Sequence, residues 1–413
     1  MIKTLTIFVC LCTILVGCGN GRSKNTGKEK VMNTDSTTLY GYNRDFLRKH
    51  TRIIELKNKN AAVAIAPDWQ GRVMTSTQDG DGGLSFGWIN RELIASGKLS
   101  KHINAFGGEE RIWLGPEGGQ FSIFFPKGKD FVYDNWQTPQ FIDSEPWDVV
   151  SSDKASASFL TRVSVVNYSG TRFDLQVERK IVLLDEAELT KETGISSEGL
   201  KSVAYRSENV LTNKGTAEWK KETGLLSVWM LGMFTPSPSV VIVIPVKDGG
   251  ERSLGVKVND NYFGKISSNR LKVEGNHIFF RADGKSRGKI GIPPLRSAGV
   301  MGSYDSDSNI LTLLFCKLPS GTTDYVNSAW KLQDNPYSGD AFNSYNDGPL
   351  ADGTQMGPFY ELETSSPAAA LAAGKSLTHS QVTVHITGDR NLLDKIALKT
   401  LGVSLKEIEE AFK

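Results

Sequence analysis

Two glutamates on one short strand are the strongest candidates for acid–base chemistry in this chain of 413 residues. They are Glu361 and Glu363, in the segment GPFYELET at residues 357–364. Strand alternation predicts Tyr360 and Leu362 on the core side, so both carboxylates project together from the other face. Paired carboxylates repel each other, and this repulsion raises the pKa of one of them, which suits a general acid or base. An ordinary exposed strand face is the alternative.

A calcium site is a third interpretation of the same region. Two carboxylates and a few nearby amide or carboxylate oxygens are enough to bind Ca²⁺. Residues of this kind precede the strand, namely Asn343, Asn346, Asp347 and Asp352. Their spacing does not match an EF-hand, and the nucleotide-binding, zinc-protease and α/β-hydrolase motifs are absent from the sequence. We therefore expect no cofactor, with a bound calcium ion as the open alternative.

A second candidate segment is FGGEERIWLGPEGGQFSIFF at residues 106–125. We predict that it forms a ligand-binding wall from Glu109, Glu110, Arg111, Trp113 and Glu117. In an extended backbone Glu109 and Arg111 share one face, and Glu110 takes the other. The glycine doublets on both sides suit a loop wrapped closely around a ligand. The alternative is a solvated turn with a local salt bridge that contributes roughly 0–1 kcal/mol.

Four further polar residues are weaker candidates. His102 is a candidate general acid or base near neutral pH, with Asn104 beside it, although an exposed loop histidine is the simpler interpretation. Arg206 and Asn209 lie on opposite faces of a predicted strand at residues 205–212. Such alternation normally means a solvent face, but in a concave sheet the same face can be the ligand floor.

Tryptophans could add sugar-stacking faces to such a site. The candidates are Trp229 and Trp330. A tryptophan in an apolar β run is more often part of the core.

The elements that must position these residues are mostly strands. Short runs rich in Val, Ile, Phe and Thr are broken by Gly, Asn, Asp and Pro, which indicates an all-β sandwich or barrel at residues 39–390. The clearer runs are residues 52–56, 62–66, 120–125, 158–166, 173–184, 205–212, 225–230, 240–246, 271–273, 277–281, 289–292, 310–318, 357–363 and 377–386.

Helical periodicity is weak except near the two ends of this region. Residues 40–50 fit a short helix, and residues 391–399 and 404–412 fit two more in a C-terminal tail at 391–413. Ser404 and Glu407 have capping-box spacing. We predict that this tail packs against a sheet edge; a free helix for a partner is the alternative.

The N-terminus predicts a lipid-anchored protein of the cell envelope. Lys3, an apolar run at residues 5–16 and the ending Leu15-Val16-Gly17-Cys18 resemble a bacterial lipoprotein signal at residues 1–17. An ordinary signal peptide that is cut elsewhere is the alternative. Cys18 would carry the lipid on the periplasmic face or at the outer membrane, and residues 18–38 would form a flexible tether. Cys316 then remains alone in the folded part, which excludes a disulfide framework.

The formal charge of +2 gives no sign of a nucleic-acid partner.

Four short motifs along the chain are Glu361-Leu362-Glu363 with Ser365-Ser366-Pro367, then residues 371–379, Gly71-Arg72-Val73-Met74 and residues 209–215. Together they resemble galactose mutarotase-like (aldose 1-epimerase-like) proteins, and more particularly uncharacterised lipoproteins of Bacteroidetes. The resemblance covers most of residues 40–390 and implies a β-supersandwich that binds a sugar on a concave sheet.

It also implies roles for two side chains. Glu361 or Glu363 matches the base that takes the anomeric proton. The histidine that protonates the ring oxygen has no match, because Ser227-Val228-Trp229-Met230 stands where the family has its His-x-Tyr-Phe-Asn pattern. His102 replaces it only if its loop reaches the same floor.

Two functions follow as hypotheses. One is an envelope lipoprotein that binds carbohydrate in a concave cleft and has sugar epimerase activity. The other is a non-catalytic glycan-binding or structural envelope lipoprotein.

Overall fold

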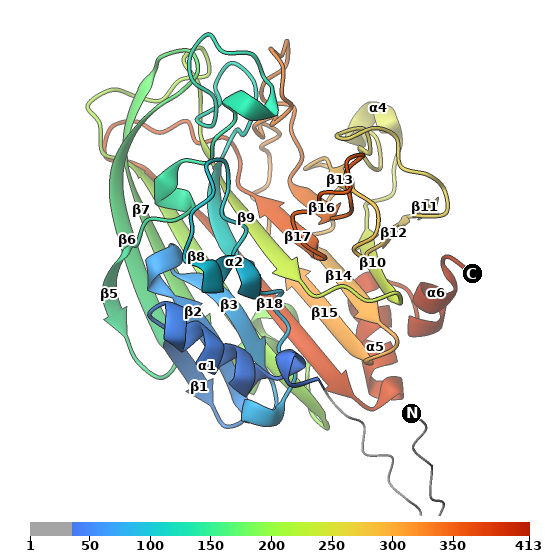
Figure 1. Cartoon of the computed structure of the whole chain (residues 1–413). Helices are drawn as coiled ribbons and strands as arrows, with labels where there is room; N and C mark the ends of the chain where they lie inside the picture. The colour runs from blue at the N-terminus through green and yellow to red at the C-terminus, as the bar shows by residue number, and fades with distance from the viewer. Residues whose placement is uncertain (1–34) are drawn as a thin grey trace, which may run out of the picture. The chain divides into compact units, whose positions relative to one another are not determined.

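The computed structural model describes residues 35–413, and residues 36–413 form one unit by their contacts. Within this range, antiparallel strands form three sheets arranged in two layers (Figure 1). The prediction of an all-β fold with short C-terminal helices is therefore confirmed. The predicted signal peptide, Cys18 and nearly all of the predicted tether lie outside the described residues.

The back layer is a ten-stranded sheet. In pairing order its strands are β11 (Leu271–Glu274), β12 (His277–Arg281), β10 (Val240–Pro245), β14 (Val300–Asp305), β15 (Ile310–Phe315), β18 (Ser376–Gly388), β8 (Leu200–Asn213), β7 (Arg172–Leu183), β6 (Ser156–Val166) and β5 (Asp148–Ser152). β18 pairs with β8 over its whole length without a break in the register. The two strands lie in the middle of the sheet.

The front layer combines a five-stranded and a three-stranded sheet. The strands of the first, in pairing order, are β13 (Gly288–Ile292), β16 (Phe342–Asn346), β17 (Tyr360–Ser365), β9 (Ser227–Phe234) and β4 (Arg111–Gly115). The second contains β1 (Ile54–Asn58), β2 (Ala61–Ala66) and β3 (Arg72–Thr77). A bridge between Val73 and Glu110 joins the two sheets at the start of β4.

The main core lies between the two layers. On β17, Tyr360 and Leu362 are buried among apolar residues of β10, β12, β14 and β15, as strand alternation predicts. The opposite side of β17 therefore turns Glu361 and Glu363 away from the ten-stranded sheet. Every residue of the neighbouring strand β9 is buried, which shows that the far side of the five-stranded sheet is also covered by protein.

Helices cover parts of both layers. They are α1 (Tyr40–His50), α2 (Arg91–Ser96), α3 (Glu186–Thr193), α4 (Glu251–Leu254), α5 (Arg390–Leu401) and α6 (Leu405–Glu410). Single 3-10 turns lie at Ser36–Thr38, Pro67–Trp69, Gly80–Gly82, Tyr133–Asn135 and Gln140–Ile142. The predicted helix at residues 40–50 is confirmed, and α1 and α2 pack with Ala66 and Met74 of the three-stranded sheet.

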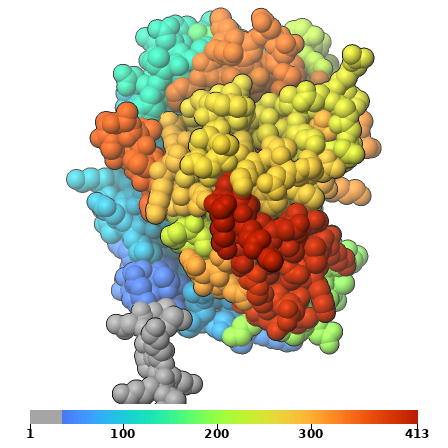
Figure 2. Space-filling view, turned by 90° about the vertical axis from the view of Figure 1, so that its right-hand side faces the viewer, coloured from blue at the N-terminus to red at the C-terminus, as the bar shows by residue number. Residues whose placement is uncertain are grey.

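The two predicted C-terminal helices are also confirmed, with the capping box of Ser404 and Glu407. They pack on the face of the ten-stranded sheet, so the predicted packing against its edge is wrong. The reason is the apolar stripe of α5, whose Leu393 and Leu401 join one cluster with Leu311, Val384 and others from the middle of the sheet. Figure 2 shows both helices, in dark red, on the surface of the molecule.

Some strand predictions failed. Residues 120–125 form turns, whereas β3, β4, β5, β14 and β16 were not predicted as strands. β4 and β16 carry arginine, asparagine, serine and glycine among their few residues, which hid their strand pattern. In residues 35–413, no helix is both long and apolar enough to cross a bilayer.

Candidate functional site

The face of the five-stranded sheet that points away from the ten-stranded sheet carries most of the candidate residues; we call it the site face. Cross-strand register defines it, because Arg111 stands opposite Leu231 and Leu231 stands opposite Glu363. Trp113 stands opposite Trp229 in the next row of the same face. Two segments about 250 residues apart in the sequence thus meet on one face of the sheet, as predicted for the wall and the acidic strand.

Glu361 and Arg111 form a buried ion pair on this face. The Nη2 of Arg111 lies 3.0 Å from Oε1 of Glu361, and both side chains are at most 6% exposed. Burial raises the pKa of Glu361 to about 7; Arg111 acts against this rise and the charge of Glu363 adds to it. A carboxyl group with such a pKa can both accept and donate a proton at neutral pH.

Glu363 is held in a different way. It accepts hydrogen bonds from Nε1 of Trp229 at 2.8 Å and from Nζ of Lys289 at 2.9 and 3.0 Å. The ammonium of Lys289 also lies 4.7 Å from the ring centroid of Trp229. Glu363 is fully buried and paired, so it is suited to fixing positive charge and geometry rather than to moving protons.

Lys289 is a site residue that the sequence motifs did not predict. Its strand reads GKIGI, with Ile290 and Ile292 buried in the core. Alternation places Lys289 on the opposite side of the strand, so a lone lysine in an apolar strand was the available signal.

Glu117 lies in the loop after β4, close enough to Lys289, Glu363 and Arg111 for their charges to influence its pKa. Its pKa is raised to about 7 by burial, against the effects of Lys289 and of a hydrogen bond from Trp330. Part of its surface stays open to solvent. We call the five charged groups Arg111, Glu117, Lys289, Glu361 and Glu363 the outer cluster.

The outer cluster contains buried donors that no described residue accepts. Within residues 35–413, Nε and Nη1 of Arg111 and Nε1 of Trp113 have no hydrogen-bond partner. The guanidinium lies over the Trp113 ring at 4.4 Å, and that ring meets Trp229 edge to face at 5.5 Å. Each buried polar group without a partner costs about 1–3 kcal/mol. A ligand with several hydroxyl groups would remove this cost.

Glu109 and Glu110 do not lie on the site face. Glu110 pairs with Arg179 of β7 at 2.7 Å and accepts from Nε2 of Gln381 at 2.6 Å. Glu109 lies 3.1 Å from Nε2 of His385 on β18. These contacts all lie between the two layers, and we call these five residues the inner network.

The expectation that Glu109 and Arg111 share a face is therefore wrong, and a bulge explains it. Met233 donates its N–H to the carbonyl of Gly108, while Arg111 stands opposite Leu231. Two residues, Glu109 and Glu110, thus stand opposite the single Gly232, and the extra residue reverses the alternation.

The glycine doublets have a different role from the predicted one. Gly107 has φ +93°, and a Cβ there would lie 2.1 Å from the carbonyl oxygen of Trp88. A Cβ on Gly118 would lie 2.5 Å from the carbonyl oxygen of Ala329. These glycines therefore let other segments of the chain approach closely, and not a ligand as predicted.

His102 and Asn104 lie beside the site without joining the outer cluster. Nδ1 of His102 lies 2.6 Å from the carbonyl oxygen of Trp136, and its ring packs against Tyr133. Asn104 binds the carboxylate of Asp143 through its side chain and its backbone N–H. Among the described contacts, neither residue reaches Glu361 or Glu363.

Arg206 and Asn209 point to opposite sides of the ten-stranded sheet, as predicted. Arg206 forms an ion pair with Glu192 of α3 on the side away from the core. Asn209 is fully buried and accepts from Nη1 of Arg179 at 2.8 Å. The structure therefore brings neither residue to the site face.

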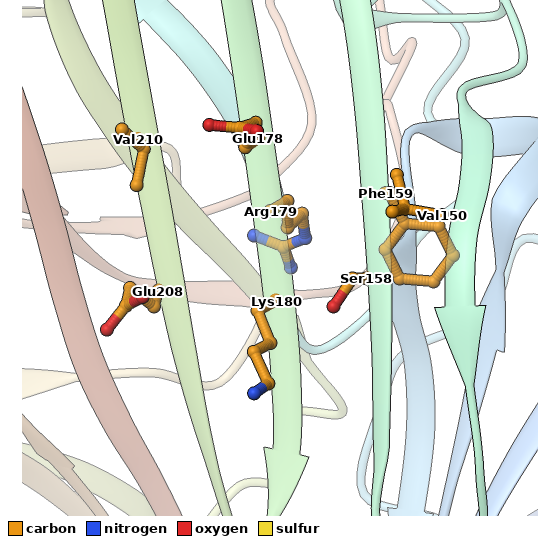
Figure 3. Close-up of a pocket in the computed structure, with 8 residues that line it drawn as sticks. All are labelled: Val150, Ser158, Phe159, Glu178, Arg179, Lys180, Glu208 and Val210. Atoms are coloured by element: carbon orange, nitrogen blue, oxygen red, sulfur yellow. The ribbon is translucent and has the colours of Figure 1, made fainter. Parts of the chain in front are cut away.

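A surface hollow lies on the same outer side of the ten-stranded sheet as Arg206 (Figure 3). It has a volume of about 260 Å³ and is lined by Val150, Ser158, Phe159, Glu178, Arg179, Lys180, Glu208 and Val210. None of these residues belongs to the outer cluster, so the hollow does not add to that site.

Metal ligands are not gathered in the described part of the chain. No group of three or more His, Cys, Asp or Glu side chains in residues 35–413 is arranged to hold a metal ion. All four residues that precede the strand in the calcium alternative have protein partners. Asn343 and Asn346 donate to the carbonyls of Ile290 and Ser286, and Asp347 and Asp352 accept from the hydroxyls of Tyr345 and Thr354.

Comparison with known proteins gives one family and several similar folds. A model described as a family of unknown function (DUF6786) matches residues 38–412. No curated protein matches.

Among solved structures, a putative aldose 1-epimerase from Escherichia coli K12 is 12% identical, with 81% of this chain and 98% of that chain covered and a TM-score of 0.47. A galactose mutarotase-like protein from Lactobacillus casei ATCC 334 is 12% identical, with 81% and 100% covered and a TM-score of 0.47. The Slr1438 protein from Synechocystis sp. PCC 6803 is 15% identical, with 82% and 96% covered and a TM-score of 0.48. All three structures are less than 25% identical to this chain, and their TM-scores lie below 0.5.

Proposed function

The chain belongs to the family of unknown function DUF6786, and we propose that it binds a carbohydrate on the site face. The observation that carries this proposal is the set of buried donors of Arg111 and Trp113 that no described residue accepts. These donors lie beside carboxylates and indole rings. A sugar offers hydroxyl oxygens to the donors and C–H faces to the rings.

The charges of the outer cluster favour a neutral sugar. Three carboxyl groups, Glu117, Glu361 and Glu363, face the two cations Arg111 and Lys289. Both cations already lie next to carboxylates, so an anionic ligand would meet net negative charge when these acids are ionised. We propose that binding needs no metal, because the ammonium and the guanidinium supply the positive charge.

Calorimetric titration with glucose, galactose and mannose tests the proposal. We expect saturable heat with at least one of these sugars, and a loss of affinity of about tenfold or more in Glu363→Gln, because the carboxamide cannot hold Lys289 as an ion pair. Arg206→Ala is the control and should bind like the unaltered protein. Absence of binding to all three sugars would contradict carbohydrate binding on this face.

We further propose that the site transfers protons on the bound sugar, as the sequence resemblance implies. The specific observation is a pair of carboxyl groups, Glu117 and Glu361, whose pKa values are both raised to about 7. The pKa of each is influenced by the same three groups, Arg111, Lys289 and Glu363. Two carboxyl groups of this kind can exchange the roles of acid and base.

The proposed reaction is interconversion of the two anomers. Glu361 takes the proton of the anomeric hydroxyl, whose oxygen becomes the carbonyl oxygen of the open-chain aldehyde. The bond from the anomeric carbon to the ring oxygen breaks, and its electron pair stays on that oxygen, which Glu117 protonates. Rotation of the aldehyde and the reverse steps close the ring on the other face. Glu117 takes the role for which the sequence offered His102.

NMR of freshly dissolved α-glucose and α-galactose tests this reaction. We expect anomer interconversion above the spontaneous rate, and a loss of about 10²- to 10⁴-fold in Glu361→Gln and in Glu117→Gln. Binding without acceleration would instead support the alternative, a non-catalytic glycan-binding lipoprotein. If the protein neither binds nor accelerates, a structural role in the envelope remains.

The location is also a proposal and depends on residues 1–18 alone. We propose cleavage before Cys18, lipidation of its sulfur and anchoring in the envelope of a Bacteroidetes cell, with no nucleic-acid partner. Mass spectrometry of the mature protein should find Cys18 at the N-terminus with a diacylglycerol adduct. An unmodified protein that starts at another residue would contradict the anchor.

A further inference from the structure

A row of aromatic rings leads away from the outer cluster toward the surface. It begins at Trp330, which donates a hydrogen bond to Glu117. Trp136 stacks on Trp330 with ring centroids 5.7 Å apart, and Tyr133 stacks on Trp136 at 5.9 Å. We call Tyr133, Trp136 and Trp330 the aromatic row.

Two loops from distant parts of the sequence build this row. Tyr133 and Trp136 belong to the long loop between β4 and β5, and Trp330 belongs to the loop between β15 and β16. The two loops stand side by side at the top of the molecule, teal and orange in Figures 1 and 2. Gly118 allows this contact, because its Cα approaches the carbonyl of Ala329 too closely for a side chain.

The row has two features that packing alone does not explain. Tyr133 at its outer end is 55% exposed, although it is a large aromatic residue stacked on another ring. Trp136 is only 5% exposed, yet its Nε1 has no acceptor among residues 35–413. An exposed ring and a buried donor without a partner, both adjoining a proposed site, indicate a surface that a ligand completes.

We propose that the aromatic row is a second binding site, continuous with the site face, for further units of a neutral oligosaccharide. This inference rests on the proposed carbohydrate binding, and it makes a sugar chain rather than a free monosaccharide the preferred ligand. The C–H face of a pyranose stacks on an exposed ring, and its hydroxyl oxygens accept from an indole N–H. When the three acids of the outer cluster are ionised, its net negative charge disfavours chains of sugar acids.

Hexasaccharides and their monosaccharides separate this inference from the proposed function. The probes are cellohexaose and maltohexaose against glucose, β-1,4-galactohexaose against galactose, and β-1,4-mannohexaose against mannose, each in calorimetric titrations. We expect a hexasaccharide to bind about tenfold more tightly than its monosaccharide. Tyr133→Ala should lower hexasaccharide affinity about three- to tenfold and leave monosaccharide affinity unchanged.

Tyr42→Ala is the matched control, because Tyr42 is also an exposed tyrosine, 43% exposed, but lies on α1. Trp136→Phe keeps a ring in the row and removes its N–H, and it should also weaken hexasaccharide binding alone. Circular dichroism checks that each variant is folded.

Each other outcome overturns one of the two proposals or both. Equal affinities for hexasaccharide and monosaccharide, with no effect of Tyr133→Ala, would overturn the aromatic row and leave sugar binding intact. If no sugar binds, both proposals fail. If Tyr133→Ala instead converts a dimer to a monomer in light scattering and changes no affinity, the row is a contact between copies of the chain.

Discussion

Two buried arginines, Arg179 and Arg111, show how differently the two sides of the five-stranded sheet are built. Arg179 in the inner network is 1% exposed, and all three of its guanidinium nitrogens have acceptors: the carbonyl of Gly71, Asn209 and Glu110. Arg111 in the outer cluster is 4% exposed, yet only its Nη2 has an acceptor within the described residues, Glu361.

The difference separates a structural polar group from a candidate functional one. Glu110 and Arg111 are neighbours in the sequence, but one completes a saturated ion pair in the core and the other leaves donors unpaired. Removing one partner of a fully paired buried charge is strongly destabilising, whereas a buried donor without an acceptor itself lowers stability. The unsaturated guanidinium of Arg111 is therefore where we expect a ligand.

The largest expected effect is on stability, from Arg179→Met. Removing this guanidinium leaves Glu110 buried without its charged partner, which typically costs about 3–5 kcal/mol. Urea unfolding at pH 7 measures the loss. A change of less than about 1 kcal/mol would show that the ion pair of Arg179 and Glu110 is not a structural element of the core.

The same substitution in the outer cluster is the matched comparison. Arg111→Met removes two unpaired donors, and Glu361 can stay protonated because its pKa is already about 7. We expect a loss of no more than about 1–2 kcal/mol in unfolding free energy together with a loss of sugar affinity of about tenfold or more. A large stability loss with unchanged affinity would reverse the assignment of the two arginines.

The pH dependence of stability should have opposite signs on the two sides. The pKa of Glu361 rises from 4.5 to about 7 on folding, so the folded state binds more protons between these values. Its contribution to stability is therefore present at low pH and is lost as pH rises through this window. Glu361→Gln should remove that part of the decline in unfolding free energy. An unchanged profile would mean that Glu361 is ionised in the folded protein.

His379 lies on the core side and should act in the reverse direction. Burial lowers its pKa from 6.5 to about 4, and its Nε2 lies 2.8 Å from the hydroxyl of Thr364. The folded state thus binds fewer protons in this window, and stability falls as pH drops from 6.5 toward 4. Thermal unfolding of His379→Gln should show a weaker acid-induced decline. If the variant loses stability in acid as steeply as the unaltered protein, His379 is not the cause of the acid-induced decline.

The smallest effect is expected at Arg206. Its ion pair with Glu192 is partly exposed and lies on the outer side of the ten-stranded sheet. Arg206→Ala should change the unfolding free energy by no more than about 1 kcal/mol and leave sugar affinity unchanged. Weakened sugar binding in this variant would revive the sequence-based proposal that Arg206 contacts ligand.

Local patterns predicted much of this fold but not the partners of each strand. The regular alternation of β17 gave the correct sides for Tyr360, Leu362, Glu361 and Glu363, and apolar spacing gave the C-terminal helices. The bulge at Glu109 and Glu110 depends on the register with β9, which the sequence of β4 alone does not contain.

Long-range pairing also hid part of the candidate site. Lys289 meets Glu363 only because β13, β16 and β17 lie side by side, an order that the sequence of β13 does not reveal. The same holds for Trp229, which reaches Glu363 from the strand on its other side.

The most direct test of the unsaturated site is the indole N–H resonance of Trp113 during a sugar titration, observed in ¹H–¹⁵N NMR spectra. Trp147 is the internal control, because it is 2% exposed and its Nε1 already donates to the carbonyl of Phe141 at 2.7 Å. With the sugar that gives calorimetric heat, we predict a saturable shift of the Trp113 resonance and none for Trp147. A stationary Trp113 resonance under saturating sugar would contradict the claim that these unpaired donors are the binding site.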